Sequence, residues 1–136
     1  WARNVDGSAR RLAASSVDRL EDATISFQSV QQWDGAGQLP ALIALTRRVW
    51  RDRAFGDVWP YMLVAEGQIE MVAEFDVAEY DIAAAVPIVR EAGGMFTAFD
   101  GVDTLSGRSS LATNGILHQD FLDFLGEDRP GTIGSR

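Results

Sequence analysis

Two patterns of hydrophobic and polar residues, one typical of strands and one typical of helices, alternate along this chain. Residues 23–29 (ATISFQS) alternate apolar and polar side chains, which is typical of a strand, whereas residues 39–49 repeat apolar positions at helical spacing. The same reasoning predicts extended segments or strands over 11–16, 23–29, 49–54, 68–74, 95–99 and 110–113, and helices over 16–22, 39–49, 58–66, 81–92 and 115–125.

The helix predicted over 81–92 carries two features that bear on its shape. Pro87 falls inside it, where the ring crowds the carbonyl of Ala83, so a kink is expected. Gly93 and Gly94 end the helix, because glycine lets the chain turn sharply into the next strand.

Strands that alternate with helices favour an α/β fold, with a mostly parallel sheet flanked by helices on both faces. No internal repeat or linker divides the sequence, so residues 1–136 are expected to form one compact unit. The polar residues 127–136 are expected to form a flexible tail.

Composition narrows the class of protein. With 46% hydrophobic and 24% charged residues among 136, the chain is an ordinary globular protein, and no apolar stretch is long enough to cross a bilayer. The absence of cysteine excludes disulfides and thiolate sites and fits the cytoplasm. A net charge of −8 disfavours nucleic-acid partners. The chain begins at Trp1 without a targeting segment, so we expect an incompletely represented chain.

Carboxylates crowd one strand–loop–helix corner, at Glu70, Glu74, Asp76, Glu79 and Asp81. Asp81 begins the predicted helix, where its carboxylate could cap a backbone N–H. Alternatively it could bind Mg²⁺, which takes one or two carboxylates together with water and a substrate phosphate. From the local sequence alone both interpretations stay open.

Asp57 and Arg53 lie just ahead of another predicted helix. Asp57 could be a helix cap and Arg53 a surface residue, and the local sequence favours these structural roles.

The order of motifs nevertheless resembles the inositol monophosphatase family over nearly the whole chain. YDIA at 80–83 followed by EAGG at 91–94 is similar to a signature of that family, with Tyr80 where the family commonly has tryptophan. RAFGD at 53–57, LVAEG at 63–67 and TNGILH at 113–118 resemble most closely the actinobacterial-type histidinol-phosphatase branch.

The resemblance implies that this chain is the C-terminal half of a layered αβαβα sandwich, with its N-terminal half absent. By the same resemblance, Asp81 is a metal ligand for Mg²⁺, and Glu74 contacts the alcohol part of the substrate. Asp57 and Arg53 would line the substrate pocket. The Glu-Glu and Asp-Pro-Ile/Leu-Asp-Gly-Thr motifs, which supply the family's other ligands, have no counterpart in this sequence.

The implied activity is hydrolysis of a small phosphate monoester, with histidinol phosphate of the histidine-biosynthesis pathway as the favoured substrate. Its ammonium group would pair with Asp57 or Glu74. An inositol phosphate or a sugar phosphate is the alternative substrate within the family. A homodimer or higher oligomer is expected, because a lost half would uncover apolar surface. The alternative from another class is a truncated, inactive fragment that binds or oligomerises.

Overall fold

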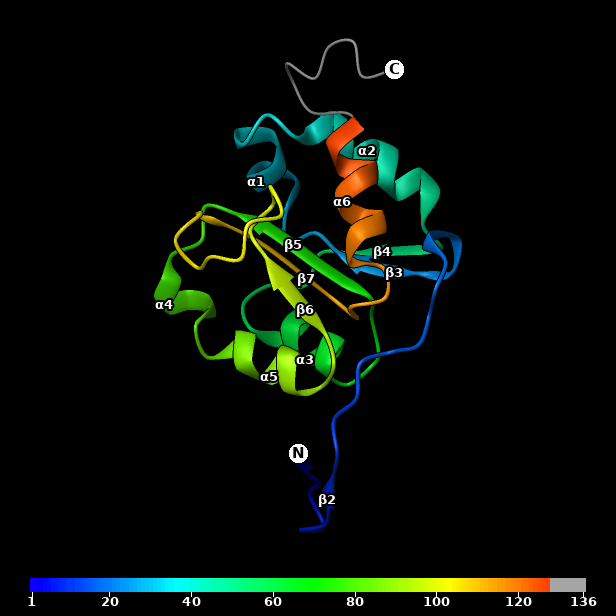
Figure 1. Cartoon of the computed structure of the whole chain (residues 1–136), viewed down its shortest axis with the longest axis vertical. Coiled ribbons are helices and arrows are strands. Elements are labelled where there is room, and N and C mark those ends of the chain that lie inside the picture. The colour runs from blue at the N-terminus through cyan, green and yellow to red at the C-terminus, as the bar shows by residue number, and fades with distance from the viewer. Residues whose placement is uncertain (128–136) are drawn as a thin grey trace.

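The computed structural model describes residues 1–127 and contains a five-stranded sheet between two groups of helices (Figure 1). The strands are β1 (Ala2–Arg3), β2 (Ala9–Arg10), β3 (Thr24–Ser26), β4 (Arg51–Arg53), β5 (Met71–Phe75), β6 (Met95–Thr97) and β7 (Ser109–Thr113). The helices are η1 (Leu20–Asp22), α1 (Val30–Gly35), α2 (Leu39–Arg48), α3 (Trp59–Ala65), α4 (Glu79–Ile82), α5 (Ala85–Glu91) and α6 (His118–Glu127).

The main sheet has the strand order β4-β3-β5-β7-β6. β4, β3 and β5 pair in parallel, whereas β7 runs antiparallel to both β5 and β6. The α/β class is therefore confirmed, and the mostly parallel sheet proves to be a mixed one. A loop without a crossover helix joins β6 to β7, and neighbouring strands connected in this way run antiparallel.

Each face of the sheet has its own hydrophobic core. Met71, Ala73 and Phe75 of β5 contribute to the core on the side of α1, α2 and α6. Val72, from the same strand, packs on the opposite side with Tyr61 of α3. All five residues of β5 are buried, because this strand lies in the middle of the sheet and alternates its side chains between two covered faces.

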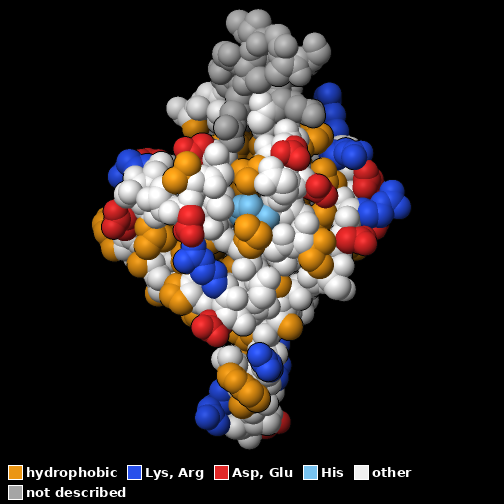
Figure 2. Space-filling view, in the orientation of Figure 1, with side chains coloured by type: hydrophobic (Ala, Val, Ile, Leu, Met, Phe, Trp, Pro, Cys, Tyr) orange, Lys and Arg blue, Asp and Glu red, His pale blue; other side chains and the backbone are white. Residues whose placement is uncertain are grey.

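His118, the first residue of α6, ties that helix to the sheet. The Thr97 hydroxyl donates to the Ala98 carbonyl at 2.7 Å, so its oxygen accepts from His118 Nε2 at 2.9 Å. Nδ1 then accepts from the Thr113 hydroxyl at 2.9 Å, and that oxygen also accepts the Gly115 N–H. These partners fit a neutral imidazole. Figure 2 shows the histidine only through a small opening, and its side chain is 2% exposed.

The N-terminal region differs most from the sequence-based expectation. Residues 11–16 form no strand. The Ala14 N–H donates to the Ala92 carbonyl at 2.8 Å, which is the carbonyl of a helix end and not of a strand. Asn114 donates to the carbonyls of Ser15 and Val17 at 3.2 and 2.8 Å. The helix predicted over 16–22 is reduced to the three-residue turn η1, preceded by an extended Arg19. β1 and β2 form a separate hairpin that projects from the body in Figure 1.

Two helical regions also differ from prediction. α1 was not expected, yet Ser29 caps it by accepting the Gln32 N–H at 3.2 Å. The single helix predicted over 81–92 is two helices, and the expected kink at Pro87 is a break before it. Pro87 becomes the third residue of α5, where the break relieves its clash with the preceding turn.

The predicted flexible tail falls almost entirely outside the described residues, except that Glu127 ends α6. Within residues 1–127, every helix is too short or too polar to cross a membrane.

Candidate functional site

The functional residues expected from the sequence follow the carboxyl ends of the parallel strands. β4, β3 and β5 end at the same edge of the sheet, which is the usual place for a ligand in an α/β fold. Non-glycine residues with left-handed backbone gather there: Gln28 after β3, Asp57 after β4, Asp76 after β5 and Arg108 just before β7, with φ of 70°, 61°, 56° and 54°. Such strain clusters at functional sites in proteins.

Glu74 is the buried carboxylate of this edge, with 3% of its surface exposed. The Tyr61 hydroxyl of α3 donates to Glu74 Oε1 at 2.6 Å and lies 2.7 Å from the Ser110 hydroxyl. Burial raises the pKa of Glu74, the Tyr61 hydrogen bond opposes that rise, and the charges of Asp81 and Asp57 raise it further. Asp81 and Asp57 therefore each lie within electrostatic range of Glu74.

Asp81 is exposed and is the third residue of α4, not its cap. Its Oδ2 accepts the Ala78 N–H at 3.1 Å, which is the reciprocal half of a capping box. The Asp81 carboxylate thus caps a backbone N–H as expected, but it does so from the third residue of the helix and not from the position before the first residue. The helix begins earlier because Glu79 and Tyr80 also join α4.

Arg53 and Asp57 reach the same edge through β4 and the loop that follows it. Both are exposed. Arg53 donates to the neighbouring Asp52 carbonyl at 2.7 Å, and within residues 1–127 the structure gives it no contact with the three carboxylates. The fold therefore brings Glu74, Asp81 and Asp57 together and leaves Arg53 at the end of the adjacent strands.

Two residues at this edge, Tyr61 and Arg108, were not predicted from the sequence, and Asp76 was predicted only as one of the clustered carboxylates. Arg108 donates to Asp76 Oδ1 at 2.5 Å, and this bond, followed by the charges of Asp76, Tyr80 and Asp81, raises the pKa of Arg108. Helical spacing could have indicated that Tyr61 faces the sheet. The ion pair joins residues far apart in the chain, so no local pattern predicts it.

The carboxylates of this edge fit a Mg²⁺ site that takes its other ligands from elsewhere better than they fit a site that binds Mg²⁺ alone. Residues 1–127 contain no group of three or more His, Asp or Glu side chains arranged to hold a metal ion on its own. Asp81 is exposed, however, and only its Oδ2 is engaged by the backbone. Because Mg²⁺ keeps several waters and commonly takes one or two carboxylates with substrate phosphate, Asp81 fits as one ligand of such a site.

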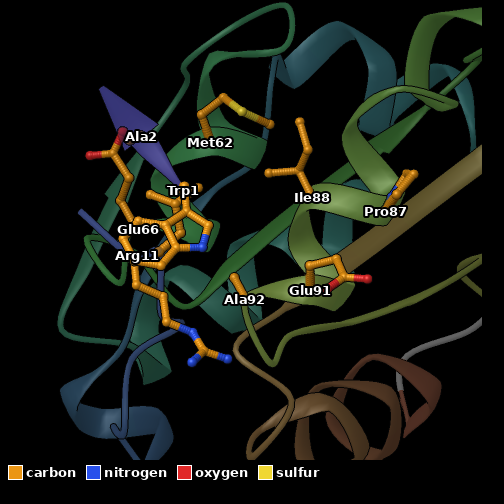
Figure 3. Close-up of a pocket in the computed structure, with 10 residues that line it drawn as sticks. Trp1, Ala2, Arg11, Met62, Glu66, Pro87, Ile88, Glu91 and Ala92 are labelled. Carbon is orange, nitrogen blue, oxygen red and sulfur yellow. The ribbon is translucent and has the colours of Figure 1, made fainter. Parts of the chain in front are cut away.

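An apolar cavity of about 530 Å³ lies at the other end of the molecule, away from these carboxylates. Figure 3 shows Trp1 and Arg11 of the N-terminal segment facing Met62, Ile88 and other residues of α3 and α5. Its lining includes Met62 of α3 and Ile88 of α5 and none of the carboxylates Glu74, Asp81 and Asp57. We therefore assign it no part in the chemistry of Glu74 and Asp81.

Comparison with known proteins decides the family. The model of the inositol monophosphatase family matches residues 10–126. The chain belongs to this family. Among solved structures of the family's fold, the Thermotoga maritima IMPase superimposes with a TM-score of 0.76 at 26% identity, covering 87% of this chain and 46% of that one.

Curated relatives within the inositol monophosphatase family include histidinol-phosphatases. The chain is 44% identical to that of Streptomyces coelicolor and 47% identical to that of Mycobacterium tuberculosis, each over 120 residues and 88% of this chain. An inositol-1-monophosphatase of Caulobacter vibrioides is 30% identical over 124 residues. The chain spans about half the length of these relatives, 45% to 48%, and matches their C-terminal half.

Proposed function

We propose that the whole protein containing this chain is a Mg²⁺-dependent histidinol-phosphatase of histidine biosynthesis, working in the cytoplasm. The observation that carries the proposal is the 44% and 47% identity to two histidinol-phosphatases over 88% of the chain. The carboxylates at the carboxyl edge support it, because Asp81 and Asp57 both act on Glu74 and such groups suit a metal ion and a cationic alcohol.

In this proposal Asp81 supplies one metal ligand, and the bound Mg²⁺ provides the Lewis-acid chemistry that activates water and stabilises the leaving alkoxide. Asp57 is exposed and Glu74 is buried, and the charge of Asp57 acts on Glu74. The two carboxylates would pair with the ammonium group of histidinol, and Tyr61 would hold Glu74 in place. Arg53 would line the outer part of the same pocket.

An inositol phosphate is the second candidate substrate, because an inositol-1-monophosphatase shares 30% identity over a similar span. The two candidates differ in charge. Inositol offers hydroxyl groups where histidinol offers an ammonium, so two carboxylates around the alcohol favour histidinol.

The experiment measures phosphate release by the whole protein from histidinol phosphate and from inositol 1-phosphate, with Mg²⁺ and after chelation with EDTA. We expect a higher kcat/KM for histidinol phosphate and loss of both activities with EDTA. A preference for inositol phosphate would exclude the histidine pathway, and full activity in EDTA would exclude the metal.

Residues 1–136 alone are proposed to be inactive, because their described part offers one metal ligand and no complete cluster. The isolated chain should release no phosphate from either substrate under conditions in which the whole protein does. Sedimentation of the whole protein would show whether it forms the homodimer or larger oligomer expected from the sequence.

A further inference from the structure

Arg108 and Asp76 form an ion pair at the same edge of the sheet as the candidate metal ligand. Asp76 is the first residue after β5 and Arg108 is the last before β7, next to the terminal strand pair Phe75 and Ser109. The Arg108 guanidinium donates to Asp76 Oδ1 at 2.5 Å, and the Arg108 carbonyl accepts the Val77 N–H at 3.3 Å. The pair therefore fixes the start of the loop that leads to Asp81.

Stability does not explain this arrangement. Both residues have left-handed backbone, at φ 56° and 54°, a conformation that side chains other than glycine adopt at a cost in free energy. The side chains are 81% and 64% exposed, and ion pairs in such positions contribute little to folding. The strain is thus retained without a matching gain in the stability of the fold, which points to a use in function.

The position of the guanidinium indicates what that use is. The charge of Asp81 adds to that of Asp76 in raising the pKa of Arg108, so the guanidinium lies within electrostatic range of α4. Arg108 and Asp76 also line an open groove of about 680 Å³ with Gln32 of α1. The exposed guanidinium of Arg108 thus lies at the carboxyl edge, where it can approach both α4 and this groove.

Anionic substrates meet an unfavourable charge at this edge. Glu74, Asp57, Asp76 and Asp81 all carry carboxylates, and a phosphate monoester adds further negative charge. Asp76 engages one nitrogen of the Arg108 guanidinium, whereas the group has five N–H donors in a planar fork. Arginine uses this fork to bind phosphate oxygens in pairs.

We propose that Arg108 is a substrate-binding residue, held in place by Asp76, that contacts the phosphoryl group of a substrate bound at the Asp81 edge. This inference rests on the proposed phosphatase function for its substrate. It assigns to Asp76 a positioning role, because the carboxylate fixes the guanidinium without facing the phosphate. The phosphoryl group would then be held by Arg108 on the side that faces solvent.

The test is the R108Q variant of the whole protein, compared with R90Q. Arg90 is the matched control, because its guanidinium pairs with exposed Asp103 at 2.6 Å and is similarly exposed, away from this edge. We expect R108Q to weaken binding of inorganic phosphate in the presence of Mg²⁺, measured by calorimetry, by about tenfold, as for loss of one charged hydrogen bond. KM for histidinol phosphate should rise similarly, with Mg²⁺ affinity measured without phosphate unchanged.

Two further results separate this role from a structural one. If R108Q weakens Mg²⁺ and phosphate binding equally, Arg108 only supports the loop that carries Asp81, and the proposal is wrong. Unchanged phosphate binding and KM in an active enzyme would also overturn it, while leaving the phosphatase function intact. If the wild-type protein hydrolyses neither substrate but binds phosphate through Arg108, the proposed function fails and the binding role stands.

Discussion

The Tyr61 hydroxyl lies 2.6 Å from Oε1 of Glu74, and this bond joins helix α3 to the middle strand of the sheet. Both side chains are buried, with 1% and 3% of their surfaces exposed. Burial of a carboxylate is unfavourable unless a donor accompanies it. The hydrogen bond from Tyr61 therefore allows the Glu74 carboxyl group, charged or protonated, to be buried in the candidate site.

Tyr61→Phe is expected to destabilise the whole protein by about 1 to 3 kcal/mol, because the buried Glu74 carboxylate loses its donor. The free energy of unfolding in urea at pH 7 measures this change. Tyr80→Phe is the control, since Tyr80 is 85% exposed. Equal stability of the two variants would contradict the role given to the Tyr61 hydroxyl.

Asp81→Asn is expected to lower kcat/KM for phosphate release by more than about 100-fold, because the amide is a far weaker ligand for Mg²⁺ than the carboxylate. The fold should be little affected, since Asp81 is exposed and asparagine can still accept the Ala78 N–H. Glu79→Gln serves as the control on the same helix turn. If Asp81→Asn retained wild-type turnover, the ligand assignment would be wrong.

Much of the fold follows from local patterns. The helices α2, α3 and α6 and the strands β3 to β7 all overlap the segments predicted from the sequence. All of these elements except the exposed strand β4 bury apolar side chains in one of the two cores. The errors occur where tertiary contacts decide. Residues 11–16 are apolar enough for a strand, yet Asn114, about a hundred positions later in the chain, binds Ser15 and keeps the segment out of the sheet.

In the candidate site, too, local patterns predict some residues, and tertiary contacts decide the others. Asp81, Glu74 and Asp57 are predicted from motif and resemblance, and in the structure the charges of Asp81 and Asp57 both act on Glu74. Asp76 and Arg108 belong to no motif and meet only because β5 and β7 are antiparallel neighbours. Their ion pair depends on strand register, which the sequence pattern does not specify.

His118 is expected to make folding stability pH-dependent. Burial lowers its pKa from 6.5 to about 4, so between these values the unfolded chain binds a proton that the folded chain does not. The contribution is fully present above pH 6.5 and is lost as the pH falls towards 4, by roughly 3 kcal/mol. Urea unfolding of wild type and His118→Gln from pH 7.5 to 4.5 measures it. A stability difference that stays constant across this range would contradict the assignment.

Glu74→Gln is expected to separate stability from activity. Because the pKa of Glu74 is raised above 4.5, the folded state disfavours the charged carboxylate, and its contribution to stability falls as the pH rises above 4.5. Glutamine still accepts the Tyr61 hydroxyl but carries no charge. The variant should therefore be as stable as wild type near pH 4 and more stable than wild type near pH 8. Its KM for histidinol phosphate should rise, since the ammonium loses one counter-charge. Glu79→Gln, at an exposed position, should change neither quantity. A Glu74→Gln variant less stable than wild type at pH 8 would show that the charged carboxylate supports the fold.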